Sequence, residues 1–133
     1  MKKKKLLVLF ASSFKTSTLS YVNGYPDALK KTDLFEVTLC NFGKIQPFKW
    51  IDKLKVYLAT NYDFILMMHT TSHQLYYFWE KIIKKKKIPI IWFICNEYRG
   101  MPEKLKFAKE MGISMLVSQS LSKSIHLMYQ KNL

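Results

Sequence analysis

The side chains best suited to chemistry come in five short polar stretches, each placed at the end of an apolar run. These stretches contain hydroxyl, amide, imidazole and carboxylate groups, which can hydrogen-bond a polyhydroxylated or phosphorylated ligand. The same residue types also cap helices and close turns, so their composition leaves a purely structural role open. The stretches are Ser12 to Thr18, Asn41 to Gly43, His69 to His73, Asn96 to Arg99 and Ser118 to Ser120.

The candidate acid–base groups in these stretches are His69 and Glu97. An imidazole titrates near neutral pH and can accept a proton from a substrate hydroxyl. Glu97 is the only carboxylate in the five stretches, and its simplest role is an ion pair with Arg99 or a lysine. His69 and His73 are four residues apart, but one ends a predicted strand and the other begins a helix, so helical spacing does not bring them together. We therefore predict no metal site.

Five apolar runs precede the polar stretches and are expected to be the strands that position them. Their hydrophobicity is continuous rather than alternating, which is typical of strands buried on both faces. The predicted strands are Leu6–Ala11, Phe35–Cys40, Phe64–His69, Ile88–Cys95 and Met115–Ser118.

Segments with helical spacing of apolar residues separate these runs. A proline near the start and a glycine at the end mark the clearest one, which opens at Pro102 and stops at Gly112. Thr16 to Lys31 is the weakest helix candidate, because Gly24 and Pro26 interrupt it. Further helices are expected from Pro47, from Ser72 and from Leu121.

Alternating strands and helices predict right-handed crossovers and a Rossmann-like α/β/α sandwich of three layers. Its five-stranded parallel sheet is expected to have the order 3-2-1-4-5, with the flavodoxin-like order 2-1-3-4-5 as the alternative. Residues 1–133 are expected to form a single such domain. Ligands of open parallel sheets bind outside the carboxyl ends of the strands, where the polar stretches gather.

The chain carries 22 Lys+Arg against 9 Asp+Glu, a formal net charge of +13, and Arg99 is its single arginine. Proteins that read nucleic acids favour the arginine fork, so a nucleic-acid partner is not predicted. The runs Lys2–Lys5 and Lys84–Lys87 each precede a strand and are expected at the amino-terminal edge of the sheet. They either form solvated ends or contact a surface of anionic lipid.

The apolar run after Lys5 stops at Ala11, which is short for a signal peptide, and no run is long enough to span a membrane. A cytoplasmic location is expected. Peripheral association with the inner face of the cell membrane is the alternative that the lysine runs suggest.

From Ile88 onward a strand ends in Asn96-Glu97-Tyr98, a helix follows at Pro102, and the next strand ends in Ser118-Gln119. This pattern resembles the amino-terminal domain of bacterial GT-B glycosyltransferases. Tyr62 to His69 and Lys4 to Phe14 are similar to the third and first strands of that family. The glycine-rich first loop of the family is absent from this chain.

The resemblance implies that this domain holds the acceptor and that a separate domain or subunit, absent here, binds the nucleotide-sugar donor. The chain alone would then be inactive, it would need no cofactor, and its acceptor would be a glycan or a lipid-linked sugar. The resemblance implies His69 or Glu97 as the base, with Ser13, Asn96, Tyr98 and Ser118 positioning the acceptor.

Two other functions remain open from the sequence. One is a non-catalytic interaction or membrane-adaptor module that works through the lysine runs. The other is a flavodoxin-like binder of phosphate or flavin, in which the first polar stretch surrounds the phosphate and Trp92 or Tyr98 flanks the flavin ring. The chain has neither a GxGxxG fingerprint after its first strand nor a Walker motif.

Overall fold

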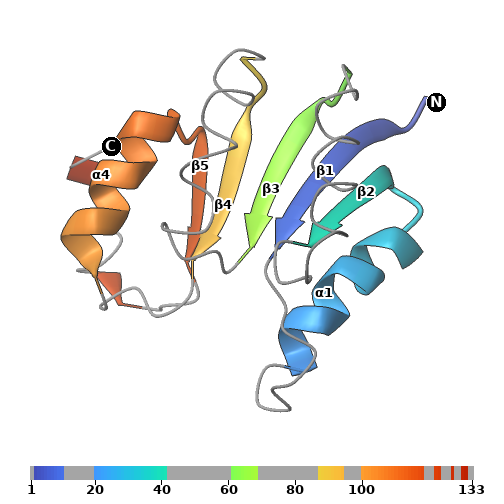
Figure 1. Cartoon of the computed structure of the whole chain (residues 1–133), viewed down its shortest axis with the longest axis horizontal. Helices are drawn as coiled ribbons and strands as arrows, with labels where there is room; N and C mark the ends of the chain where they lie inside the picture. The colour runs from blue at the N-terminus through green and yellow to red at the C-terminus, as the bar shows by residue number, and fades with distance from the viewer. Residues whose placement is uncertain are drawn as a thin grey trace.

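The computed structural model describes residues 2–10, 20–41, 61–68, 87–94 and 100–118, together with 122, 123, 127, 130 and 131. Its centre is a five-stranded sheet in which every neighbouring pair of strands is parallel (Figure 1). The strands lie where the apolar runs predicted them: β1 (Lys4–Phe10), β2 (Phe35–Asn41), β3 (Phe64–Met68), β4 (Ile90–Ile94) and β5 (Met115–Ser118).

The predicted α/β class is confirmed, whereas the preferred strand order is wrong. The observed order is β2-β1-β3-β4-β5, so β1 pairs with β2 on one side and with β3 on the other. Leu9 of β1 is level with Cys40 of β2 and with Met67 of β3. The handedness of a crossover decides which face it covers, but not whether the chain returns beside β2 or beside β1.

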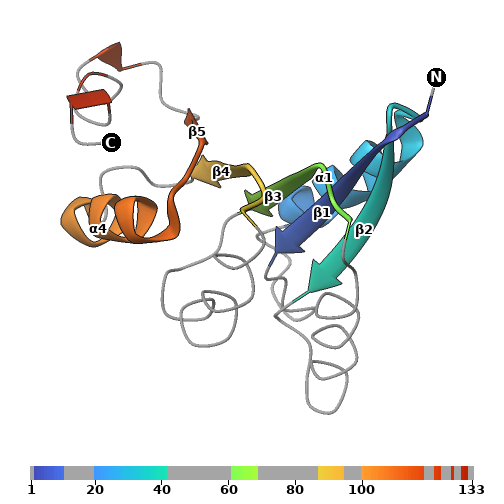
Figure 2. The same ribbon diagram turned by 90° about the horizontal axis from the view of Figure 1, so that it is seen from above.

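Two helices, α1 (Ser20–Lys31) and α4 (Met101–Met111), cover opposite faces of the sheet (Figure 2). The chain moves from β1 to β2 in one direction and from β4 to β5 in the other, so right-handed crossovers place the two helices on different faces. The α4 face holds Leu9, Met67 and Trp92 under Phe107. The α1 face holds Val8 with Leu29 packed against its cluster.

Proline and glycine mark the two ends of α4, as predicted. Pro102 lies in its first turn and Gly112 caps its carboxyl end with φ of 63°. The amide of Gly112 donates to the carbonyl oxygen of Lys109 at 3.1 Å, and that of Ile113 donates to Ala108 at 3.0 Å. A left-handed residue at this position lets the last carbonyl groups of the helix find donors.

Helix α1 continues through Gly24 and Pro26, which the sequence marked as interruptions. Its packing on the sheet, through Leu29, outweighs their low helix propensity. The helix ends where the hydroxyl of Thr32 donates to the carbonyl oxygen of Leu29 at 2.8 Å, followed by Asp33 with φ of 59°.

The helices expected from Pro47 and Ser72 lie outside the described residues. Of the last expected helix, Lys123, Leu127, Gln130 and Lys131 are helical. No helix in the described part of the chain is long and apolar enough to cross a membrane.

Met67 and Met115 provide a matched test of the core, because both are strand methionines with exposed fractions of 0% and 57%. Met67→Ala should lower the free energy of unfolding by about 2–5 kcal/mol, since it leaves a cavity between β1 and β4. Met115→Ala should change it by less than about 0.5 kcal/mol. Urea denaturation followed by circular dichroism measures both values, and equal losses would contradict this description of the core.

Candidate ligand-binding edge

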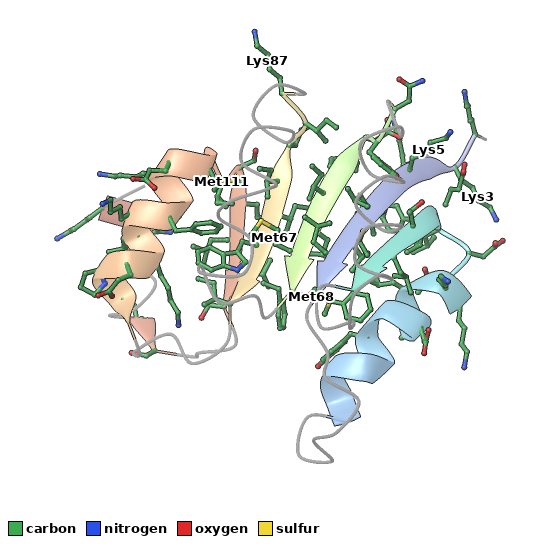
Figure 3. All side chains as sticks on the ribbon, viewed as in Figure 1. Lys3, Lys5, Met67, Met68, Lys87 and Met111 are labelled. Atoms are coloured by element: carbon green, nitrogen blue, oxygen red, sulfur yellow. The ribbon has the colours of Figure 1, made fainter. Side chains whose placement is uncertain are left out.

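The topology places the candidate site at the carboxyl ends of β1 and β3. The chain leaves β1 toward one side of the sheet and leaves β3 toward the other, and open parallel sheets bind ligands in a crevice at such a switch point. The last residues of the two strands, Phe10 and Met68, are level with one another. Figure 3 shows Met68 at this end of β3. A ligand bound in the crevice would lie beyond Phe10 and Met68.

The described floor of this edge is apolar. Phe10 and Met68 belong to the cluster on the α1 face, and Phe93 of β4 is the next residue in the same row. The ring of Tyr25 in α1 lies 6.0 Å from the ring of Phe93, and Tyr25 is 43% exposed. Tyr25 therefore brings a solvent-accessible aromatic ring close to the edge, a residue that the sequence analysis did not single out.

Helix α1 directs its positive end toward this edge. It carries the chain from the carboxyl end of β1 back to the amino end of β2, so its first residue, Ser20, lies on the carboxyl side of the sheet. Its first turn contains no acidic residue, and its last turn carries Lys30 and Lys31. The partial positive charge at the start of a helix attracts anions, and here no first-turn carboxylate offsets it.

Of the site residues predicted from the sequence, the structure describes only Ser118, and the other five lie outside the described residues and stay predictions. Ser118 ends β5, level with Ile94, and is half-buried. β5 is separated from β3 by β4, so Ser118 lies about 10 Å from the β1–β3 crevice. The five others are Ser13, His69, Asn96, Glu97 and Tyr98.

Trp92 does not reach the ligand edge, so its expected role beside a flavin ring is wrong. Its side chain is 2% exposed and lies on the α4 face, with its ring 5.1 Å from that of Phe107. The indole Nε1 is buried and has no hydrogen-bond partner among the described residues. The error has a simple cause, since a continuous apolar run does not reveal which face each side chain occupies.

The groups with shifted pKa values lie at the opposite edge, where β1 and β3 begin. The amide of Lys5 donates to Asp63 Oδ2 at 2.7 Å, and this bond holds the pKa of Asp63 below its usual range. The amide of Asp63 in turn donates to the carbonyl oxygen of Lys5 at 2.9 Å. Burial raises the pKa of the neighbouring Tyr62 above its ordinary value. These groups fasten two strands together and lie away from the crevice.

The comparisons with known proteins add little beyond the fold. No protein-family model matches the chain, and no curated protein matches its sequence. Among solved structures, it is similar to a diflavin flavoprotein A3 from Nostoc sp., with 10% identity and a TM-score of 0.48, over 98% of this chain and 90% of that one. The strand order decides the fold type. The fold is flavodoxin-like.

The predicted membership of the GT-B glycosyltransferases is therefore corrected. The sheet has the order 2-1-3-4-5 instead of the preferred Rossmann-like order 3-2-1-4-5. Neither a family model nor a curated protein supports that family. The transferase activity was inferred from that resemblance and loses its basis. The roles of the six site residues, the acceptor and the donor-binding partner stay predictions. The polar residues at the strand ends remain candidates for another ligand.

Asp63 makes stability depend on pH in the acid range. Because folding lowers the pKa of Asp63, its contribution is complete above the unfolded pKa and is lost as the pH falls through the lower, folded value. The free energy of unfolding should therefore decrease below about pH 4, and Asp63→Asn should show a smaller decrease than the wild type. Urea denaturation at stepped pH values measures this, with Asp27→Asn, an exposed carboxylate of α1, as control. Identical pH dependence in the wild type and Asp63→Asn would contradict this role.

Two substitutions of Trp92 separate the effect of core packing from the effect of burying an N–H donor without a partner. Trp92→Ala should lower the free energy of unfolding by about 3–5 kcal/mol through the cavity it leaves beside Phe107. Trp92→Phe should cost clearly less, because it also removes an N–H group that has no acceptor. Equal losses for the two variants, measured by urea denaturation, would show that the indole nitrogen makes a stabilising contact.

Proposed function

We propose that this chain binds a phosphorylated ligand of the flavin mononucleotide class at the carboxyl ends of β1 and β3. The observation that carries the proposal is the strand order β2-β1-β3-β4-β5. Flavodoxin-like sheets of this order hold flavin mononucleotide at the β1/β3 switch point. The proposal thus rests on this chain's own topology.

The phosphate end of such a ligand has suitable partners. The segment that follows β1 contains Ser12, Ser13, Thr16, Ser17 and Thr18, and it leads into the first turn of α1. Hydroxyl groups and the amides of a helix start are ordinary phosphate donors. The absence of a first-turn carboxylate in α1 removes a competitor for these donors.

The apolar part of the ligand also finds matching groups among the described residues. Phe10 and Met68 form an apolar floor, and Tyr25 presents an accessible ring near the same edge. Aromatic and apolar side chains of this kind exclude water from one side of a flat ring system. A bound flavin would supply hydride or electron transfer, and these residues would hold and orient it.

Titration with flavin mononucleotide, followed by quenching of flavin fluorescence, tests the proposal. Riboflavin, which lacks the phosphate, should bind more weakly. Ser20→Glu places a carboxylate in the first turn of α1 and should weaken binding of flavin mononucleotide about two- to fivefold. Gln130→Glu, the same charge change at an exposed position, should leave binding unchanged.

Two results would contradict the proposal. Riboflavin binding as tightly as flavin mononucleotide would exclude recognition of the phosphate. Equal weakening by Gln130→Glu and Ser20→Glu would show that overall charge, and not the start of α1, governs binding. Circular dichroism of both variants checks that each is folded.

A further inference from the structure

Lysines gather at the amino ends of the strands, opposite the candidate ligand site. In a parallel sheet, the residues that precede strands and those that end crossover helices meet at one edge. This lysine edge consists of Lys2–Lys5, Lys30, Lys31, Lys87 and Lys109. Figure 3 shows Lys3, Lys5 and Lys87 on the side where β1 and β4 begin.

The four carboxylates that the structure describes at this edge are engaged in ion pairs. Lys3 pairs with Asp33, Lys4 Nζ lies 3.4 Å from Asp63, and Lys5 Nζ lies 3.9 Å from Glu36. The fourth carboxylate is that of Glu110, whose Oε1 atom lies 4.0 Å from Nζ of Lys106 in the middle of α4.

The remaining lysines of the edge are exposed, and within the described part of the chain none of them makes an ion pair. These lysines are Lys2, Lys30, Lys31, Lys87 and Lys109. The edge therefore carries an excess of positive charge in contact with solvent.

Two exposed apolar side chains lie at the same edge. Leu34, immediately before β2, is 68% exposed, and Met115, the first residue of β5, is 57% exposed. Exposed apolar groups among lysines suit the boundary between lipid headgroups and acyl chains, where both kinds of side chain are stabilised. Phosphate groups of a nucleic acid would bind the lysines but gain nothing from Leu34 and Met115.

The shape of the edge favours an extended partner over a small anion. A hollow of about 380 Å³ opens between Lys87 and Lys109, but Glu110 also lines it. Glu110 is a carboxylate in the lining of this hollow, and a negative charge there disfavours an anion inside it. The exposed lysines are instead distributed around the amino ends of five strands, which span about 19 Å.

We propose that the lysine edge and Leu34 bind the surface of a membrane that contains anionic phospholipids. Each lysine near such a surface adds a favourable electrostatic contribution, whereas arginine, the preferred reader of nucleic acids, is absent from the edge. The candidate ligand crevice lies at the other ends of the strands and therefore faces away from the membrane. This proposal goes beyond the ligand-binding function and does not depend on it.

Co-sedimentation of the whole chain with vesicles of phosphatidylcholine containing about one third phosphatidylserine tests the proposal. The double variant Lys87→Gln/Lys109→Gln should lower the partition coefficient roughly 30-fold, about fivefold for each lysine. Leu34→Ser should lower it about three- to tenfold. The matched controls are Lys123→Gln, compared with Lys87→Gln alone, and Leu127→Ser. Both change exposed residues that follow β5 and should bind as the wild type.

Three outcomes would overturn the proposal. These are equal binding to vesicles of pure phosphatidylcholine, an equal loss in Lys123→Gln and Lys87→Gln, and tighter binding to a short DNA duplex than to anionic vesicles at the same ionic strength. Thermal unfolding of each variant confirms that it is folded. Binding of flavin mononucleotide is measured separately, in the absence of vesicles. The membrane proposal and the flavin proposal can therefore fail independently.

Discussion

The structure depends on the position of β1 between β2 and β3. Leu7, Val8 and Leu9 are at most 1% exposed, because strands flank β1 on both sides and apolar clusters cover both of its faces. The start of β1 is fastened to β3 by the paired hydrogen bonds between Lys5 and Asp63. Its carboxyl end at Phe10 lies at the candidate ligand edge. One buried strand thus separates a basic edge from a candidate ligand edge and fixes the distance between them.

Much of the fold could be predicted from local patterns, and its global arrangement could not. The five apolar runs predicted the strands, and Pro102 and Gly112 predicted the ends of α4. The strand order depends on which side of β1 the third strand joins, and no local pattern records that choice. Gly24 and Pro26 suggested a broken helix, but the contacts of Leu29 with the sheet override weak propensity.

The candidate site, too, could be predicted only in part from the sequence. Topology alone places the segments after β1 and β3 at the ligand edge, and the sequence analysis anticipated this. The face that Trp92 occupies depends on strand register and could not be predicted from a continuous apolar run. Tyr25 lies beside Pro26, in a segment whose helical pattern is interrupted, and so carried no signal of its own. The resemblance to glycosyltransferases rested on polar residues at strand ends and a proline at a helix start, which suit many parallel α/β sheets.

The central pairing also bears on how the protein folds. The bond between the Lys5 amide and Asp63 joins residues 58 positions apart, so closing the middle of the sheet requires a long loop to be ordered first. Parallel strands cannot form from a short hairpin, and each neighbouring pair here awaits its crossover. Such non-local contacts slow folding, and until β3 joins it, the apolar edge of β1 stays available to other strands. Lys2 to Lys5 place four positive charges at the start of that edge, and charged side chains on a strand edge disfavour its pairing with another chain.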